Sequence, residues 1–464
     1  MHPHHRPTAA TLAELRASGH TFRTVKQELR DNLVLAMREG RPRFEGILGF
    51  DETVLPALER ALLAGHDVVL LGERGQGKTR LIRTLVALMD EWSPVVEGCE
   101  INDHPEAPVC ARCRRLEDDF GDGLPVRWRH RSERYGEKLA TPDTSVGDLI
   151  GDIDPVKVAE GRTLGDPETV HYGLVPRTNR GIFAINELPD LAERIQVAML
   201  NVMEERDIQI RGYVLRLPLD VLVVASANPE DYTNRGRIIT PLKDRFGAEI
   251  RTHYPVALED EVAVIRQEAH LVADVPDHLV EILARFTRGL RGSNSVDQRS
   301  GVSARLSIAG AETVAAAALH RATSQGEARA VARVVDLAAA VGVLGGKVEF
   351  ETGEEGREEE VLTHLLRTAT AETIRQHLRG LDFTILVTAI ERGAMVTTGE
   401  QVSARDFLSG LPMLGESELY DEVCDRLAAT DDGTRASAIE LALEGLYLAR
   451  RISKESAGAE TVYG

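Results

Sequence analysis

A glycine-rich segment near residue 75 has the residue types needed to bind nucleotide phosphates. The segment Gly72-Glu73-Arg74-Gly75-Gln76-Gly77-Lys78-Thr79 fits the pattern G-x-x-x-x-G-K-[ST]. Its glycines let backbone N–H groups turn toward phosphate oxygens, and the positive N-terminal end of a following helix attracts the same charge. Lys78 would add a cation for the β- and γ-phosphates, and Thr79 would offer a hydroxyl to Mg²⁺. The pattern therefore predicts binding of ATP together with Mg²⁺.

A glycine-rich surface turn is the alternative interpretation, and the neighbouring elements argue against it. Residues 66–71, HDVVLL, have the β-branched and apolar content of a buried strand. A helix is expected to begin at Lys78. A strand before the loop and a helix after it are the context that the phosphate-binding pattern requires.

A second polar position follows another apolar run, residues 181–187, GIFAINE. Glu187 is the candidate to orient and polarise the attacking water, which ATP hydrolysis requires. Asn186 stands where such sites normally have an aspartate. The missing charge would weaken the hold on hydrated Mg²⁺, so the rate of hydrolysis is left open and an aspartate here is expected to raise it. A strand that merely ends in polar residues is the structural alternative.

Longer stretches resemble the AAA+ ATPases of the helix-2-insert branch, which includes the ATPase subunit of magnesium chelatase and the MoxR ATPases. The resemblance covers about residues 45 to 345, and its most specific part is VGDLIGDIDP at 146–155 followed by YGLVPRTNRG at 172–181. It implies a P-loop α/β core with a parallel sheet, a helical lid, and ATP bound at the boundaries between subunits of a ring.

The same resemblance implies roles for three further residues. Asn228, in VASANPE, matches a residue that positions water beside the γ-phosphate, and Arg245, in PLKDRF, matches the arginine finger that reaches a neighbouring subunit's nucleotide. Arg305, in GVSARLS, matches a nucleotide contact from the lid. Each has an ordinary alternative: a turn at Asn-Pro, a surface arginine paired with Asp244 or another acid, and an arginine at a helix start.

Three cysteines lie close together in the sequence, as Cys99, Cys110 and Cys113, with His104 between the first two. A C-x2-C pair with one more cysteine and a histidine suits tetrahedral, structural zinc, although His130 is also available as fourth ligand. Reduced free thiols and redox chemistry are the alternatives. A catalytic metal is not implied.

Alternation of strands and helices predicts an α/β fold with a mostly parallel sheet covered on both faces. Its strands are expected near residues 66–71, 126–130, 181–185, 221–225 and 248–252, and residues 206–217 are expected to form a hairpin that faces a pore or partner, or is plain sheet. Four segments are expected: a helical lead-in at 1–42, the AAA+ P-loop domain with insertions at 43–255, a helical lid at 256–346, and an added helical region at 347–464. The last ten residues are expected to be loose.

Composition narrows the class of partner. Lys and Arg total 55 against 74 Asp and Glu, a formal net charge of −19, which disfavours nucleic acid as a main partner. No apolar run approaches the roughly 18 residues that span a bilayer, and the first residues have no hydrophobic signal core. With only four cysteines, the protein is expected in the reducing cytoplasm.

Three functions remain from the sequence. The first is a magnesium-chelatase-like motor subunit that forms a hexamer and remodels a partner carrying a von Willebrand A domain, as the resemblance implies. The second is a MoxR-like chaperone for protein maturation or metal loading. The third, suggested by Asn186, is a nucleotide switch that does not hydrolyse ATP. The sequence does not name the client.

Overall fold

Five strands form the central sheet of the first unit. They are β1 (Val68–Leu71), β4 (Tyr135–Leu139), β7 (Gly181–Asn186), β10 (Val221–Ala227) and β11 (Ala248–Arg251), in the order β11-β1-β10-β7-β4. Every neighbouring pair is parallel. All residues of β1 and β7 are buried, as expected for apolar strands covered on both faces. The carboxyl ends of these strands therefore meet at one edge of the sheet.

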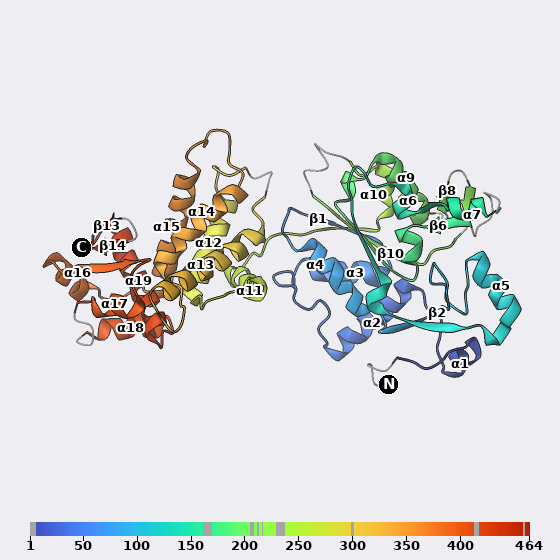
Figure 1. Cartoon of the computed structure of the whole chain (residues 1–464), viewed down its shortest axis with the longest axis horizontal. Helices are drawn as coiled ribbons and strands as arrows, with labels where there is room; N and C mark the ends of the chain where they lie inside the picture. Colours follow the sequence, from blue (N-terminus) through green and yellow to red (C-terminus); the bar gives the residue numbers. More distant parts are fainter. Residues whose placement is uncertain are drawn as a thin grey trace. The chain divides into compact units, whose positions relative to one another are not determined.

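Figure 1 shows the computed structural model of the chain. The residues that the structure describes are 6–160, 169–204, 208–210, 213–215, 217–228, 237–297, 301–412, 417–457 and 460–464. The chain divides into two compact units, Met1–His253 and Tyr254–Gly464. Among the described residues, none of the helices has the length and apolar content needed to cross a membrane.

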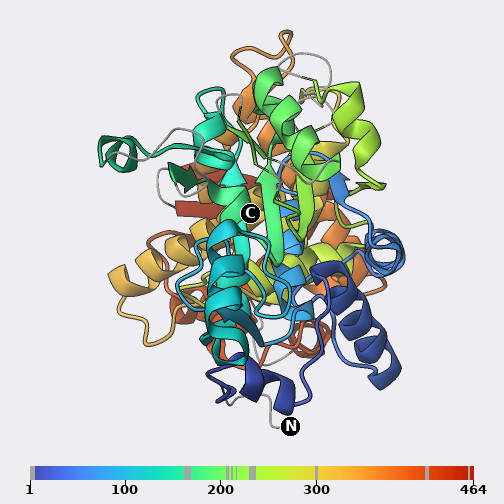
Figure 2. The ribbon, with the colours of Figure 1, turned by 90° about the vertical axis from the view of Figure 1, so that its right-hand side faces the viewer.

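Two hydrophobic cores cover opposite faces of the sheet. Val69 and Leu71 of β1 belong to one core, and Val68 and Leu70 belong to the other, because successive side chains of a strand point to opposite faces. Figure 2 shows the blue helices α2 (Val25–Glu39) and α3 (Val54–Ala64) to one side of the central strands and the cyan helix α5 (Ala111–Phe120) to the other.

The remaining elements of the first unit surround this sheet. Its other helices are α1 (Leu12–Ala17), α4 (Lys78–Thr84), α6 (Val146–Leu149), α7 (Pro155–Ala159), α8 (Leu174–Arg177), α9 (Glu193–Glu204) and α10 (Thr240–Arg245). Its antiparallel strand pairs are β2 (Trp92–Val96) with β3 (Val126–His130), β5 (Gly151–Ile153) with β6 (Val170–Tyr172), and β8 (Ile208–Ile210) with β9 (Tyr213–Leu215). The last pair is the expected hairpin, whose turn residues 211–212 lie outside the described residues.

The strand expected at residues 126–130 is present, but its expected place in the parallel sheet is wrong. Residues 126–130 form β3, which pairs antiparallel with β2 outside the central sheet. The edge position next to β7 is taken instead by β4, which the sequence analysis did not predict. β4 reads YGEKL, and only Gly136 in it is fully buried, so it lacks the apolar run of an interior strand.

A buried ion pair fixes α2 beneath this edge of the sheet. The guanidinium of Arg134 donates to both carboxylate oxygens of Glu28, at 2.6 and 2.7 Å, and its Nε donates to the carbonyl of Arg180 at 2.8 Å. Both side chains are buried. Arg180 immediately precedes β7, so the pair holds the start of that strand.

The second unit is mainly helical. Its helices are α11 (Leu258–Glu268), α12 (Asp277–Arg291), α13 (Ala304–Ser324), α14 (Ala338–Leu344), α15 (Glu358–His377), α16 (Thr384–Glu391), α17 (Ala404–Ser409), α18 (Glu418–Arg426) and α19 (Asp432–Leu448). It also has an antiparallel sheet in the order β12 (Val396–Gly399), β14 (Glu460–Tyr463), β13 (Lys454–Ala457).

The expectation of a loose C-terminus is wrong for residues 460–463. They form the central strand of that sheet, and Tyr463 is only 1% exposed. Its hydroxyl donates to Glu444 Oε2 at 2.6 Å. β14 pairs on one side with the adjacent strand β13 and on the other with β12, which lies some sixty residues earlier in the chain.

Candidate functional site

The glycine-rich loop joins β1 to α4 at the carboxyl edge of the sheet. Gly77 has φ 75° and precedes the first residue of α4, Lys78, a conformation that glycine adopts at little cost. Gly72 is required by space: a Cβ on it would lie 1.9 Å from Thr252 Oγ1 and 2.2 Å from Gln76 Oε1. Gln76 Oε1 also accepts a hydrogen bond from the Glu73 amide at 3.1 Å. The loop is thus held by its own side chains.

Lys78 places its positive charge inside this loop. Its side chain is 7% exposed and donates to the carbonyl of Gly72, to the carbonyl of Glu73 at 2.8 Å and to Asn228 Oδ1 at 2.9 Å. Oxygen partners of this kind reduce the cost of burying an ammonium group. The cation is therefore positioned where the loop's backbone would surround a phosphate. Arg74 and Gly77 are exposed, and Gly75 is half-buried.

Asn228 joins Lys78 to Glu187. It follows β10, and its Nδ2 donates to Glu187 Oε2 at 2.9 Å while its Oδ1 accepts from Lys78. An ammonium on one side and a carboxylate on the other determine the orientation of the amide. Three residues singled out from separate parts of the sequence are thus joined in one hydrogen-bonded chain.

Glu187 has an unusual backbone conformation, with φ 56° and ψ 49°. Few residues other than glycine adopt this region, and those that do are concentrated at functional sites. Its amide donates to Ser226 Oγ at 3.3 Å. The Glu187 carboxylate lies within hydrogen-bonding distance of Asn228.

Asn186 faces the start of α4. Its Oδ1 accepts hydrogen bonds from Thr79 Oγ1 and Ser226 Oγ, both at 3.2 Å. Its Nδ2 donates to Glu137 Oε1 at 2.7 Å. The amide oxygen therefore lies beside the hydroxyl of Thr79, where a hydrated Mg²⁺ would need an oxygen acceptor.

Glu137, on β4, is the site residue that the sequence analysis missed. It also accepts hydrogen bonds from Arg83 Nε and Nη2, both at 2.9 Å, and from the Tyr135 hydroxyl at 2.9 Å. The hydrogen bonds from Arg83 lower the pKa of Glu137, so the group is a carboxylate at neutral pH. Asn186 carries no charge, but Glu137, its hydrogen-bonded neighbour, does. A carboxylate is therefore present on the side of Asn186 that does not contact Thr79.

Two expected arginines are not members of this hydrogen-bonded chain among the described residues. Arg245 is the last residue of α10, and its half-exposed side chain is ion-paired with Glu204 at the end of α9. Arg305 belongs to the second unit, where it is exposed in the first turn of α13 and its amide donates to Ser303 Oγ at 3.1 Å.

The cysteine segment forms a second cluster in the first unit. The sulfurs of Cys99, Cys110 and Cys113 and a carboxylate oxygen of Asp103 all lie within 4.8 Å of one another. Hydrogen bonds from Cys110 and Cys113 lower the pKa of Cys99, and burial raises the pKa of Asp103 to about 7.

His104 does not join these cysteines, contrary to the expected ligand set. Its Nε2 lies 3.1 Å from His20 Nε2 and its Nδ1 accepts from the Glu106 amide at 3.1 Å. It belongs to a separate group with His20 and Glu106. Burial lowers the pKa of His104 to about 2, so the imidazole is neutral. Asp103, the residue before it in the sequence, takes its place.

Comparisons with known proteins identify relatives for about half of the chain. The magnesium-chelatase 38 kDa subunit of Cereibacter sphaeroides is 31% identical over 244 residues, which are 49% of this chain and 64% of the relative. The magnesium-chelatase subunit ChlI of a Nostoc species is 29% identical over 233 residues, 48% of this chain and 58% of the relative. The chain thus spans less than two thirds of these relatives. No family model matches it.

Solved structures add little to this result. A model of the complex between subunits BchI and BchD of magnesium chelatase covers 69% of this chain and 98% of its own, at 23% identity and a TM-score of 0.36. A TM-score this low does not establish a shared overall structure. The relationship therefore rests on the sequence relatives. The expected resemblance is confirmed: over about half of its length, the chain is homologous to magnesium-chelatase subunits of the AAA+ ATPase class.

Proposed function

We propose that this chain binds ATP with Mg²⁺ and hydrolyses it as one subunit of an AAA+ ring. The observation that carries the proposal is the hydrogen-bonded chain from Lys78 through Asn228 to Glu187 at the mouth of the glycine-rich loop. It combines a buried cation, an amide and a carboxylate beside backbone that can surround phosphates. These are the groups that phosphoryl transfer to water needs.

Each residue has a role that its surroundings allow. Lys78 would hold the β- and γ-phosphates in place of its present contacts with loop carbonyls. Thr79 would offer its hydroxyl to Mg²⁺, which would supply positive charge to offset that of the phosphates. Glu187 orients a water and withdraws its proton, and Asn228 holds that carboxylate in place. Gly77 has open space where a Cβ would lie, which leaves room for the phosphates. Gly75 also lacks a side chain that could fill this space.

Nucleotide binding provides the first test. Replacing Lys78 with alanine is expected to weaken ATP affinity by about 10- to 100-fold, because hydrogen bonds to charged groups contribute roughly 1.5–3 kcal/mol. Calorimetry or a fluorescent ATP analogue measures the change. Lys347→Ala, which removes an exposed lysine of the second unit, is the matched control. Equal ATP affinity in wild type and Lys78→Ala would contradict the proposal that this loop binds the phosphates of ATP.

The sequence alone predicts that an aspartate at position 186 raises the rate of ATP hydrolysis, but the contact with Glu137 alters this prediction. An aspartate there would bring a second carboxylate to the place where the Asn186 amide now meets Glu137 at 2.7 Å, and such like charges repel. We therefore expect Asn186→Asp alone to hydrolyse ATP no faster than wild type. Glu137→Gln added to Asn186→Asp is expected to raise the rate about tenfold, since contacting residues couple by 0.5–3 kcal/mol.

Steady-state hydrolysis by the four proteins of this double-mutant cycle measures that coupling. The control is Glu137→Gln alone, which leaves Asn186 in place. A rate increase in Asn186→Asp alone, with nothing added by the second change, would mean that Glu137 has no part in the site.

We also propose an assembly and a cellular setting, which rest on the resemblance noted in the sequence. The ring is a hexamer in which Arg245 reaches the next subunit's nucleotide and Arg305 contacts it from the lid. Residues 43–255 form the nucleotide domain, 256–346 the lid, and 1–42 and 347–464 the flanking regions. The partner carries a von Willebrand A domain, and the protein works in the cytoplasm without nucleic acid.

A nucleotide switch is the second candidate, favoured by the amide at Asn186. In that function the same residues bind ATP and assemble the ring, and hydrolysis is absent. ATP turnover by the assembled wild type separates the two functions.

A further inference from the structure

Two tight turns of the first unit bring four potential metal ligands together. One turn contains Cys99 and Asp103, and the other is the C-x2-C turn at the start of α5, with Cys110 and Cys113. Their exposed fractions are 9%, 1%, 7% and 0% in that order. Three thiols and a carboxyl gathered in the protein interior are unusual, because each loses its hydration there.

The Asp103 carboxylate is only half satisfied by the protein. Its Oδ2 accepts backbone hydrogen bonds from Val109 at 3.0 Å and Cys110 at 2.8 Å. Its Oδ1 is buried and has no hydrogen-bond partner among the described residues. A buried oxygen without a partner is costly, and a bound cation would satisfy it.

Backbone amides are directed at the sulfurs. The Asp103 amide donates to Cys99 Sγ and the Cys113 amide donates to Cys110 Sγ, both at 3.3 Å. Hydrogen bonds of this kind stabilise thiolate, the form of cysteine that binds metals. In each turn, a backbone amide therefore donates a hydrogen bond to a sulfur that is a potential metal ligand.

We propose that Cys99, Asp103, Cys110 and Cys113 bind a structural Zn²⁺ ion. Three sulfurs and one oxygen suit the tetrahedral preference of zinc, and Zn–S bonds of about 2.3 Å place neighbouring ligands roughly 3.7 Å apart. The ligand atoms already lie within 4.8 Å of one another, so closure around zinc needs only small movements. Four protein ligands leave no open position, which makes the ion structural.

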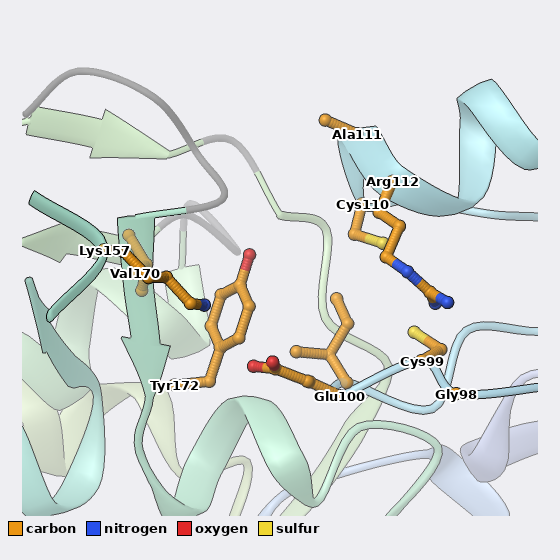
Figure 3. A pocket seen from close by; sticks show the side chains of 10 residues that line it. Gly98, Cys99, Glu100, Cys110, Ala111, Arg112, Lys157, Val170 and Tyr172 are labelled. Carbon is orange, nitrogen blue, oxygen red and sulfur yellow. The ribbon is translucent and has the colours of Figure 1, made fainter. Parts of the chain in front are cut away.

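A pocket gives zinc access to the cluster. It has a volume of about 150 Å³ and is lined by Cys99, Cys110 and Tyr172, among others. Figure 3 shows the two cysteine sulfurs on one side of it and Tyr172 with Lys157 across from them. A metal site needs such an entry path.

The ion would hold the cysteine segment against the part of the chain that leads to Glu187. Asn102, between two proposed ligands, donates to the carbonyl of Arg177 at 2.7 Å, and Asn179 donates to the carbonyl of Ile101 at 3.0 Å. Residues 177–179 lie just before Arg180, the residue that precedes β7. This role goes beyond ATP hydrolysis and does not depend on it.

Metal analysis of the full chain tests the site. Protein purified without chelators is expected to contain about one zinc per chain by elemental analysis, since the four ligands define one tetrahedral site. Cys113→Ser is expected to lose it. Cys424→Ser, which changes the one buried cysteine outside the cluster, is the matched control and is expected to keep it.

Metal-stripped, fully reduced wild type provides a measurement that does not depend on a variant's folding. It is expected to take up one equivalent of Zn²⁺ in competition with a chromophoric chelator, and with Co²⁺ to develop the intense absorption of tetrahedral thiolate coordination. Failure to bind either ion would overturn the proposal. So would a disulfide among the three cysteines in the protein as purified, with no metal, because that outcome assigns redox chemistry.

The fourth ligand is tested by a pair of neighbouring substitutions. Asp103→Asn is expected to lower zinc affinity by at least about 100-fold, because even changes to residues that only support the ligands cost 10- to 100-fold. His104→Gln is expected to leave the affinity and the Co²⁺ spectrum unchanged. The reverse result would overturn the ligand set in favour of histidine.

Discussion

Replacing Arg245 with alanine is expected to lower ATP turnover by about 10³- to 10⁵-fold, while each chain still binds ATP. A guanidinium supplied by a neighbouring subunit offsets the charge that develops on the γ-phosphate only as the bond breaks. In this chain Arg245 is half-exposed at the end of α10 and paired with Glu204. It is therefore at the surface, with a partner it can exchange for a phosphate.

Steady-state hydrolysis at saturating ATP and at protein concentrations that support assembly measures this effect. Lys243→Ala is the control, since it removes a cation from the same helix that is ion-paired with Glu249. If Arg245→Ala hydrolyses ATP within a few-fold of the wild-type rate, Arg245 has no role in catalysis and only forms the ion pair with Glu204.

Replacing Glu187 with glutamine is expected to lower the hydrolysis rate by about 10²- to 10⁴-fold without weakening ATP binding. Glutamine retains the shape and can keep the hydrogen bond from Asn228, but it cannot take a proton from water. ATP should therefore remain bound and unhydrolysed. Single-turnover hydrolysis measures the chemical step, and equilibrium binding measures ATP affinity.

Glu193→Gln is the matched control for this change, because it removes an exposed carboxylate from the first turn of α9, six residues further on. Its rate should equal that of wild type. If Glu187→Gln hydrolyses ATP as fast as this control, another residue activates the water.

The sequence predicted the parts of the site that depend on short local patterns. The glycine-rich loop needs a strand, small residues and a helix in succession, and these appear at β1, residues 72–77 and α4. The apolar runs of β7 and β10 likewise predicted two strands that end at the site. In each case the local chemistry determines the structure.

What the sequence could not predict depends on contacts between distant segments. Glu137 reaches Asn186 only because β4, a strand of mixed polarity, pairs with β7 nearly fifty residues away. Asp103 and His104 are adjacent in the sequence, so their distances from the cysteines along the chain are nearly the same. The conformation of the turn determines that Asp103, and not His104, lies beside the sulfurs. The local sequence contains no signal for either contact.

The most direct test of the central claim is to mix the two inactive variants, Arg245→Ala and Glu187→Gln, and measure ATP hydrolysis. Head-to-tail contacts in the proposed ring would place Arg245 of one subunit against Glu187 of the next, so random assembly of equal amounts would make about a quarter of the interfaces complete. We predict that the mixture recovers up to about a quarter of the wild-type rate, although each variant alone is inactive. A mixture that assembles and stays as inactive as its components would contradict a site shared between subunits.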